Sequence, residues 1–162
     1  MINKIFISFL ISIIFLQPVN SAMAFEGLIK FTGLGKTTVF LEVAATDEEK
    51  QRGLMNRSNL PSNRGMVFVF RPERKVTFWM KDTLIPLDMI FINRGKIVNI
   101  AKNALPNQTT ILYPSQEDVT EVVEVNGGFA EQHNVKVGDL IIFENIAQID
   151  YSRKSKLMIL SK

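Results

Sequence analysis

The sequence contains no cysteine, and this absence removes several kinds of chemistry at once. Disulfide bonds, thiol nucleophiles and thiolate metal sites are excluded, so packing must stabilise the fold. Histidine is almost as rare, because His133 is the only one among 162 residues. A zinc site or a Ser-His-Asp triad would depend on that single imidazole, and no Gly-x-Ser-x-Gly elbow accompanies it. We therefore interpret His133 as a surface residue and expect neither a metal nor a cofactor.

A strong excess of charge is also missing. The 19 basic and 16 acidic residues give a formal charge of +3, which becomes +2 without residues 1–24. This balance is too weak to indicate a nucleic-acid partner. Several cations gather in residues 150–162, which we interpret as a basic C-terminal tail. Such a tail is either solvated or in contact with an anionic membrane or wall polymer.

The long apolar run Ile5–Leu16 is shorter than the roughly 20 residues that span a bilayer. Lys4 precedes it, and Ala22-Met23-Ala24 follows with small residues at the cleavage-determining positions. This pattern predicts a signal peptide over residues 1–24, although a retained anchor helix is the alternative. We therefore expect an exported protein, periplasmic or extracellular, whose mature chain has no transmembrane segment.

Short apolar runs separated by turn residues fill residues 25–149 and predict a β-rich domain. Thr37–Ala45 alternates with period two, whereas Met66–Phe70 is continuously apolar, as in a strand covered on both faces. Helices are expected only near residues 46–55 and 129–134, and residues 105–120 are expected to form a long excursion. The sequence therefore predicts a mainly β fold, a small antiparallel β-barrel or sandwich with two short helices. Further strands are expected at residues 25–31, 76–81, 88–93, 96–104, 122–125 and 140–143.

A polar turn between two apolar strands is the first candidate site. Trp79, the only tryptophan, is followed by Lys81, Asp82 and Thr83, and then by Asp88. An indole face beside a cation, an acid and a hydroxyl can stack on a sugar ring or bind a carboxylate or phosphate. Alternatively, Lys81 pairs with Asp82 or Asp88 to fix a turn, and Trp79 covers a sheet edge.

Arginines flank the adjacent loop over residues 56–65. The guanidinium groups of Arg52 and Arg57 are suited to bidentate contact with a carboxylate or phosphate, and so is that of Arg64. The alternative is structural, with Arg52 pairing with a buried acid to hold the loop. Four methionines in this block favour core packing over a Cu(I) site: Met55, Met66, Met80 and Met89.

Four segments of the chain resemble one family closely: Arg52–Arg57, Leu60-Pro61, Gly65–Phe70 and Phe78–Phe91. The family is the domain-of-unknown-function family 192, a small β-rich domain common in secreted bacterial proteins. Glu124–Gly128 and Gly138-Asp139 are similar to its C-terminal signature. One departure is Asp82, where the family more often has asparagine. The resemblance covers residues 37–143 and implies a fold and a location, but no activity.

Three functional hypotheses follow. The favoured one is a non-catalytic exported module that binds a small polar or saccharide-like envelope ligand. The second is a hydrolase or transferase of envelope polymers that uses Lys81 and Asp88, although a cation beside acids lowers their pKa and disfavours glycosidase chemistry. The third is a module that presents the loop over residues 56–65 or a sheet edge to a protein. The predicted ligand-binding residues are Trp79, Lys81, Asp82, Thr83, Asp88, Arg52 and Arg57.

Overall fold

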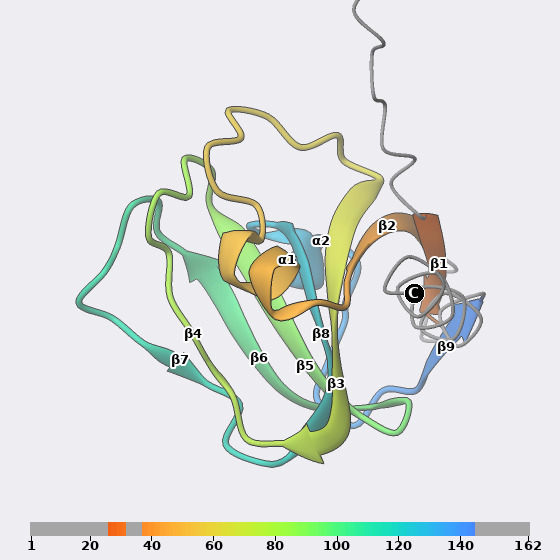
Figure 1. Cartoon of the computed structure of the whole chain (residues 1–162). Helices are drawn as coiled ribbons and strands as arrows, with labels where there is room; N and C mark the ends of the chain where they lie inside the picture. Colours follow the sequence, from red (N-terminus) through yellow and green to blue (C-terminus); the bar gives the residue numbers. More distant parts are fainter. Residues whose placement is uncertain (1–25, 32–36, 145–162) are drawn as a thin grey trace, which may run out of the picture.

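The structure is a computed structural model, and it describes residues 26–31 and 37–144 (Figure 1). The expected signal peptide and basic tail lie outside these residues. The described part contains two helices, α1 (Asp47–Arg52) and α2 (Phe129–Gln132), which confirms the predicted mainly β fold with two short helices. Its strands are β1 (Glu26–Phe31), β2 (Thr38–Ala44), β3 (Arg64–Arg74), β4 (Thr77–Phe78), β5 (Leu87–Asn93), β6 (Lys96–Ala104), β7 (Tyr113–Pro114), β8 (Val119–Asn126) and β9 (Ile141–Glu144).

Seven strands form one mixed sheet in the order β6-β5-β8-β3-β2-β1-β9. All neighbours are antiparallel except β2 and β3, which pair in parallel with Leu41 opposite Gly65. The sequence predicted an antiparallel sheet, and the difference arises from the connection between β2 and β3. That connection contains α1 and the loop over residues 56–63, and such a crossover lets the next strand run in the same direction.

The edges of the sheet approach each other at one end, where Lys96 and Leu140 form an isolated bridge. Near it, the Ile97 amide donates to the Asp139 carbonyl at 2.9 Å, and the Ile141 amide donates to the Gly95 carbonyl at 2.7 Å. The sheet is therefore curved towards a barrel and joined across its edges at this end. No helix in the described ranges is both long enough and apolar enough to span a bilayer.

Both faces of the large sheet are buried, because alternate residues of each central strand belong to different apolar clusters. Phe68, Met89, Phe91 and Val122 lie in one cluster, together with the buried Met66 and Met80. Val67, Ile90 and Val123 lie in the other, which α2 covers with Phe129 and Ala130. The predicted double-sided burial of residues 66–70 and the core packing of Met66, Met80 and Met89 are confirmed.

Helix α1 begins where its capping residues indicate. The Thr46 hydroxyl accepts a hydrogen bond from the Glu49 amide at 3.2 Å, and the Glu49 carboxylate accepts one from the Thr46 amide at 3.0 Å. This capping box satisfies two amides at the start of the helix, and the acidic first turn suits the helix dipole. Gly53 ends the helix. The site described below lies at this end.

A second, two-stranded sheet pairs β4 with β7 from the predicted excursion. Figure 1 shows β4 and β7 running beside β6, on the opposite side of the fold from β1 and β9. Beyond β4, the exposed Trp79 and Lys81 still alternate with the buried Met80. Trp79 is therefore held at the surface by a segment whose other side is packed into the core.

Candidate functional site

A groove lies between α1, the end of β3 and β4, and we call it the aromatic groove. Its volume is about 400 Å³, within the range of small-molecule sites. Phe68 packs edge-on against Phe78, with ring centroids 5.0 Å apart, while Trp79 keeps 43% of its surface exposed. The groove is lined by Asp47, Lys50, Gln51, Phe68, Phe70, Arg74, Lys75, Val76, Thr77, Phe78 and Trp79.

A narrow extension, which we call the inner pocket, shares part of the lining of the aromatic groove, including Phe68, Phe78 and Trp79. Its volume is about 30 Å³, enough for one water-sized group. The residues that line only the inner pocket are Arg52, Gly53, Leu54, Met55, Thr83 and Glu124. A ligand in the aromatic groove could therefore extend a single small group towards Glu124.

Glu124 is the most unusual side chain of the site. It lies in the middle of β8 and is 5% exposed, yet no side chain or amide of the described residues donates a hydrogen bond to its carboxyl. Burial raises the pKa of Glu124 to about 8, because the charged form has lost its water. Glu121 on the same strand differs, since Arg71 Nη2 donates to its carboxylate at 2.6 Å. A carboxyl group with a raised pKa in the wall of a pocket is typical of functional sites, so Glu124 is a candidate site residue.

Gly53 provides the space in front of Glu124. Gly53 has a φ of +48° and a ψ of −133°, a backbone conformation that residues other than glycine rarely adopt. A Cβ at this position would lie 3.2 Å from Phe68 Cζ and 3.8 Å from the nearer Glu124 carboxyl oxygen. The turn after α1 therefore approaches the sheet closely, and a side chain would narrow the inner pocket.

Cations surround the aromatic groove. Lys50 Nζ lies 5.3 Å from the centre of the Phe70 ring and the Arg74 guanidinium 5.2 Å from it, so both make cation–π contacts. Lys75 also lines the groove, Arg52 lines the inner pocket, and Asp47 is the acidic residue of the groove lining. The field in this region therefore favours an anionic ligand over a cationic one.

Of the predicted ligand-binding residues, Trp79, Thr83 and Arg52 line the inner pocket together. Thr83 is 5% exposed, and its hydroxyl donates to the Lys81 carbonyl at 3.1 Å. Lys81 lies beside the site, with its Nζ 5.5 Å from the centre of the Trp79 ring. The exposed Asp82 has a φ of +51°, and its carbonyl accepts a hydrogen bond from the Asn56 amide at 2.7 Å. Neither Asp82 nor Asp88 forms an ion pair with Lys81 in the described ranges.

Asp88 is not with the other predicted site residues, and its placement corrects the prediction. It is fully buried, and its carboxylate accepts hydrogen bonds from the amides of Asn103 at 2.8 Å, Gly128 at 3.1 Å and Ala130 at 2.7 Å. The alternation of β5 explains this, because Asp88 points to the same face as Ile90, where α2 packs. Asp88 therefore anchors the start of α2 and is not available to a ligand in the groove.

Arg57 is also engaged within the fold. Its guanidinium makes two hydrogen bonds to the Glu42 carboxylate, one of them 2.6 Å long. The hydrogen bond from Arg57 holds the pKa of Glu42 below its usual value of 4.5. The bidentate pair joins the loop after α1 to β2. The structural alternative was expected for Arg52, which lines the inner pocket instead.

His133 packs against the Phe129 ring at a centroid distance of 4.4 Å, and its Nδ1 lies 3.0 Å from the Thr37 hydroxyl. It is half-buried rather than a surface residue, because its ring packs on Phe129 and its Nδ1 contacts Thr37. No cluster of three or more acidic or histidine side chains with metal-binding geometry occurs among the residues described.

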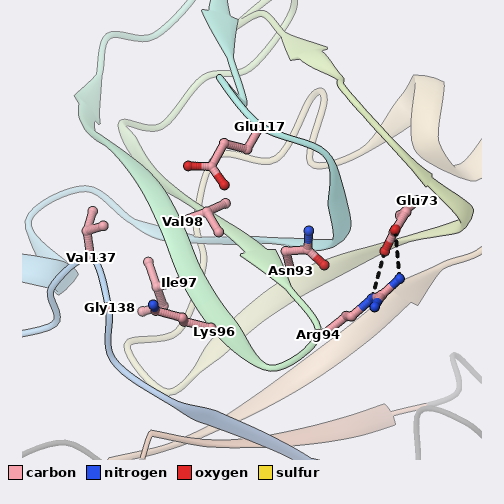
Figure 2. A pocket seen from close by; sticks show the side chains of 9 residues that line it. All are labelled: Glu73, Asn93, Arg94, Lys96, Ile97, Val98, Glu117, Val137 and Gly138. Carbon is pink, nitrogen blue, oxygen red and sulfur yellow. Dashed lines mark hydrogen bonds and ion pairs between the residues drawn. The ribbon is translucent and has the colours of Figure 1, made fainter.

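A second hollow, of about 500 Å³, opens at the β5–β6 hairpin (Figure 2). Figure 2 shows Arg94 and Glu73 facing each other at its rim, and two hydrogen bonds of 3.0 and 2.8 Å join them. The Asn93 side-chain oxygen is buried there without a hydrogen-bond partner. Because the rim arginine and acid neutralise each other and no aromatic ring lines the hollow, it fits a ligand less well than the aromatic groove.

Comparison with known proteins agrees with this fold. No curated protein matches the chain. A proposed transcription regulator from Sinorhizobium meliloti 1021 is 32% identical, with a TM-score of 0.67 over 73% of this chain and 92% of that one. A protein of unknown function from Novosphingobium aromaticivorans DSM 12444 is 35% identical, with a TM-score of 0.68 over 78% of this chain and 89% of that one. The family DUF192, described as an uncharacterized ACR, matches residues 29–143. The expected resemblance is confirmed, and the chain belongs to the domain-of-unknown-function family 192.

Proposed function

We propose that this protein is an exported, non-catalytic module that binds a small polar or saccharide-like ligand in the aromatic groove. The observation that carries the proposal is the combination of a half-exposed indole, Trp79, with a buried carboxyl, Glu124, at the inner end of one groove. Sugar rings present apolar faces to aromatic side chains and hydroxyls to polar groups, so such a combination suits them. The export part of the proposal depends on residues 1–24 and predicts a mature chain that begins at Phe25.

The positions of Lys81 and Asp88 support binding over hydrolysis. A hydrolase or transferase that uses both would need them within reach of one substrate bond. Lys81 lies at the rim beside Trp79, whereas the Asp88 carboxylate is bonded to three amides on the other face of the sheet. The structure thus offers no shared substrate position for that pair.

Titration of the purified protein with envelope saccharides and small anions, followed by the fluorescence of Trp79, tests the proposal. The only tryptophan lies in the groove, so a bound ligand should change its emission without interference from other indoles. Trp79→Ala should lose binding by calorimetry while it stays folded. Leu112→Ala is the matched control, because it truncates a side chain that is 57% exposed and lines neither hollow of the site.

Binding that survives unchanged in Trp79→Ala, or no response to any compound, would count against the proposal. Export is tested separately by cell fractionation and by the mass of the mature chain. A chain that retains residues 1–24 in the cytoplasmic fraction would overturn that part alone.

A further inference from the structure

We propose that Glu124 binds the ligand as a neutral carboxylic acid, donating a hydrogen bond to one oxygen of an anionic group. The ligand class is then an anionic saccharide, with a carboxylate or phosphoryl group that enters the inner pocket while the ring rests on Trp79. The inference rests on the binding function proposed above and specifies its ligand.

The surroundings of Glu124 favour the neutral acid. A buried carboxylate needs donors, as Asp88 shows with its three amides. Glu124 receives no hydrogen bond from the described residues, although Lys50, Arg52 and Thr83 line the same pocket. The rings of Phe68, Phe78 and Trp79 form much of the remaining wall. Its raised pKa agrees with this environment. A neutral carboxylic acid at the wall of the inner pocket has one O–H to donate, and an anionic oxygen that enters the pocket can accept it.

The charges around the inner pocket determine which kind of ligand group can accept a hydrogen bond from the Glu124 O–H. Lys50 and Arg52, both from α1, are the other charged groups of the inner-pocket lining, while β3, β4 and the residue after β4 contribute rings. Arg74 and Lys75 add positive charge to the aromatic groove, where the exposed Asp47, 4.0 Å from Lys50 Nζ, is the acidic lining residue. An ammonium group would be repelled by these cations and would require Glu124 to ionise, whereas an anionic oxygen accepts from the acid and is attracted by the cations.

The size of the inner pocket limits what enters it. About 30 Å³ holds one water-sized group, so a single carboxylate or phosphoryl oxygen fits and a whole sugar ring does not. The ring is left in the aromatic groove, whose 400 Å³ and exposed indole suit it. The aromatic groove thus holds the sugar ring by stacking, and the inner pocket holds the anionic oxygen by a hydrogen bond.

Calorimetric titration of the purified protein at pH 6.5 and pH 9.5 tests the inference with four matched sugars. Glucuronate and glucose 6-phosphate are the anionic probes, glucose is the neutral one, and glucosamine carries an ammonium group. We expect at least one anionic probe to bind about tenfold or more tightly than glucose at pH 6.5. Its affinity should fall about tenfold per pH unit above pH 8, because the donor is then lost. Comparing the two anionic probes shows whether the carboxylate or the phosphate is preferred.

Two variants make the test specific to the donor. Glu124→Gln keeps an N–H donor at the same place, so it should bind within about threefold of the wild type at pH 6.5 and lose the pH dependence. Glu124→Ala removes the donor and should lose binding at both pH values. Preferential binding of glucosamine, or loss of binding in Glu124→Gln, would show an ionised Glu124 and overturn the inference while the binding function remains. If none of the sugars binds and Trp79 emission is unchanged, both proposals fail.

Discussion

Replacing Asp88 by alanine is the most direct test of how the structure assigns this buried acid. Its carboxylate accepts hydrogen bonds from three amides, at 2.8, 3.1 and 2.7 Å. The substitution leaves three amide donors without this acceptor, of which the Ala130 amide is buried and the other two are part-buried. An unsatisfied buried donor costs about 1–3 kcal/mol, and a part-buried one costs less because water can reach it. We therefore expect the free energy of unfolding to fall by about 3–6 kcal/mol, a large part of the roughly 5–15 kcal/mol of a typical domain.

The conservative variant Asp88→Asn should lose less stability than Asp88→Ala. Its carbonyl oxygen can still accept from the amides of Asn103 and Gly128, which both donate to Oδ1 in the wild type. Its NH₂ group would face the Ala130 amide, donor against donor, so we expect an intermediate loss of about 1–3 kcal/mol. Asp82→Asn is the matched control, because it removes an exposed carboxylate and keeps a residue type that tolerates positive φ.

Urea denaturation followed by circular dichroism measures all three variants. The expected order of stability is wild type and Asp82→Asn, then Asp88→Asn, then Asp88→Ala. If Asp88→Ala lost less than about 1 kcal/mol, the three amides would not depend on this carboxylate and the structural assignment would be wrong. If it stayed fully stable and lost sugar binding instead, Asp88 would belong to a ligand site.

Three further changes have directions that follow from the structure. Gly53→Ala places a Cβ 3.2 Å from Phe68 Cζ at a φ of +48°; we expect a loss of about 1–3 kcal/mol and weaker ligand binding, and unchanged urea midpoints would contradict this. Arg57 lowers the pKa of Glu42 below 4.5, so their pair stabilises the fold above that pH and its contribution is lost as the pH falls through the folded-state pKa. In urea titrations, Arg57→Lys should lower the free energy of unfolding by about 1 kcal/mol at pH 7 and by less at pH 3. An equal loss at both pH values would refute the link between this ion pair and the ionisation of Glu42. Glu124 keeps its proton in the fold up to a pKa of about 8, whereas the unfolded chain releases it near 4.5, so stability should fall between these values by about 1 kcal/mol per pH unit. Glu124→Gln should remove this slope and be the more stable protein at pH 8; a slope that persists in the variant would exclude Glu124 as its source.

Period-two alternation explains which part of the site could be predicted. The exposed Trp79 and the lining residues Thr83 and Arg52 come from turns and helix ends, where a polar or aromatic residue between apolar runs is visible in the sequence. Asp88 looked equivalent because it follows the same turn. It lies one step along β5 from Leu87 and Met89, which belong to the other apolar cluster, and this parity places it on the opposite face.

The sequence could not identify Glu124 as a site residue, because what distinguishes it is the absence, among the described residues, of a cation or hydrogen-bond donor at its carboxyl group. Glu121 and Glu124 both interrupt an apolar strand, and the sequence alone does not distinguish them. The register of β3 against β8 does, because Arg71 of β3 reaches Glu121 and no cation reaches Glu124 in the same way. The parallel β2–β3 pair was missed for a similar reason, since the direction of a strand depends on its crossover and not on its residues.

The place of β8 in the sheet has a consequence for how the chain acquires its structure. β8 pairs with β3 on one side and β5 on the other, although it follows both by dozens of residues. A nascent chain that ends before Val119 therefore has two half-sheets with no shared neighbour, and the wall that carries Glu124 does not yet exist. Since pairing between distant segments is slow, the polypeptide should stay loosely organised and sensitive to proteases until β8 has been made.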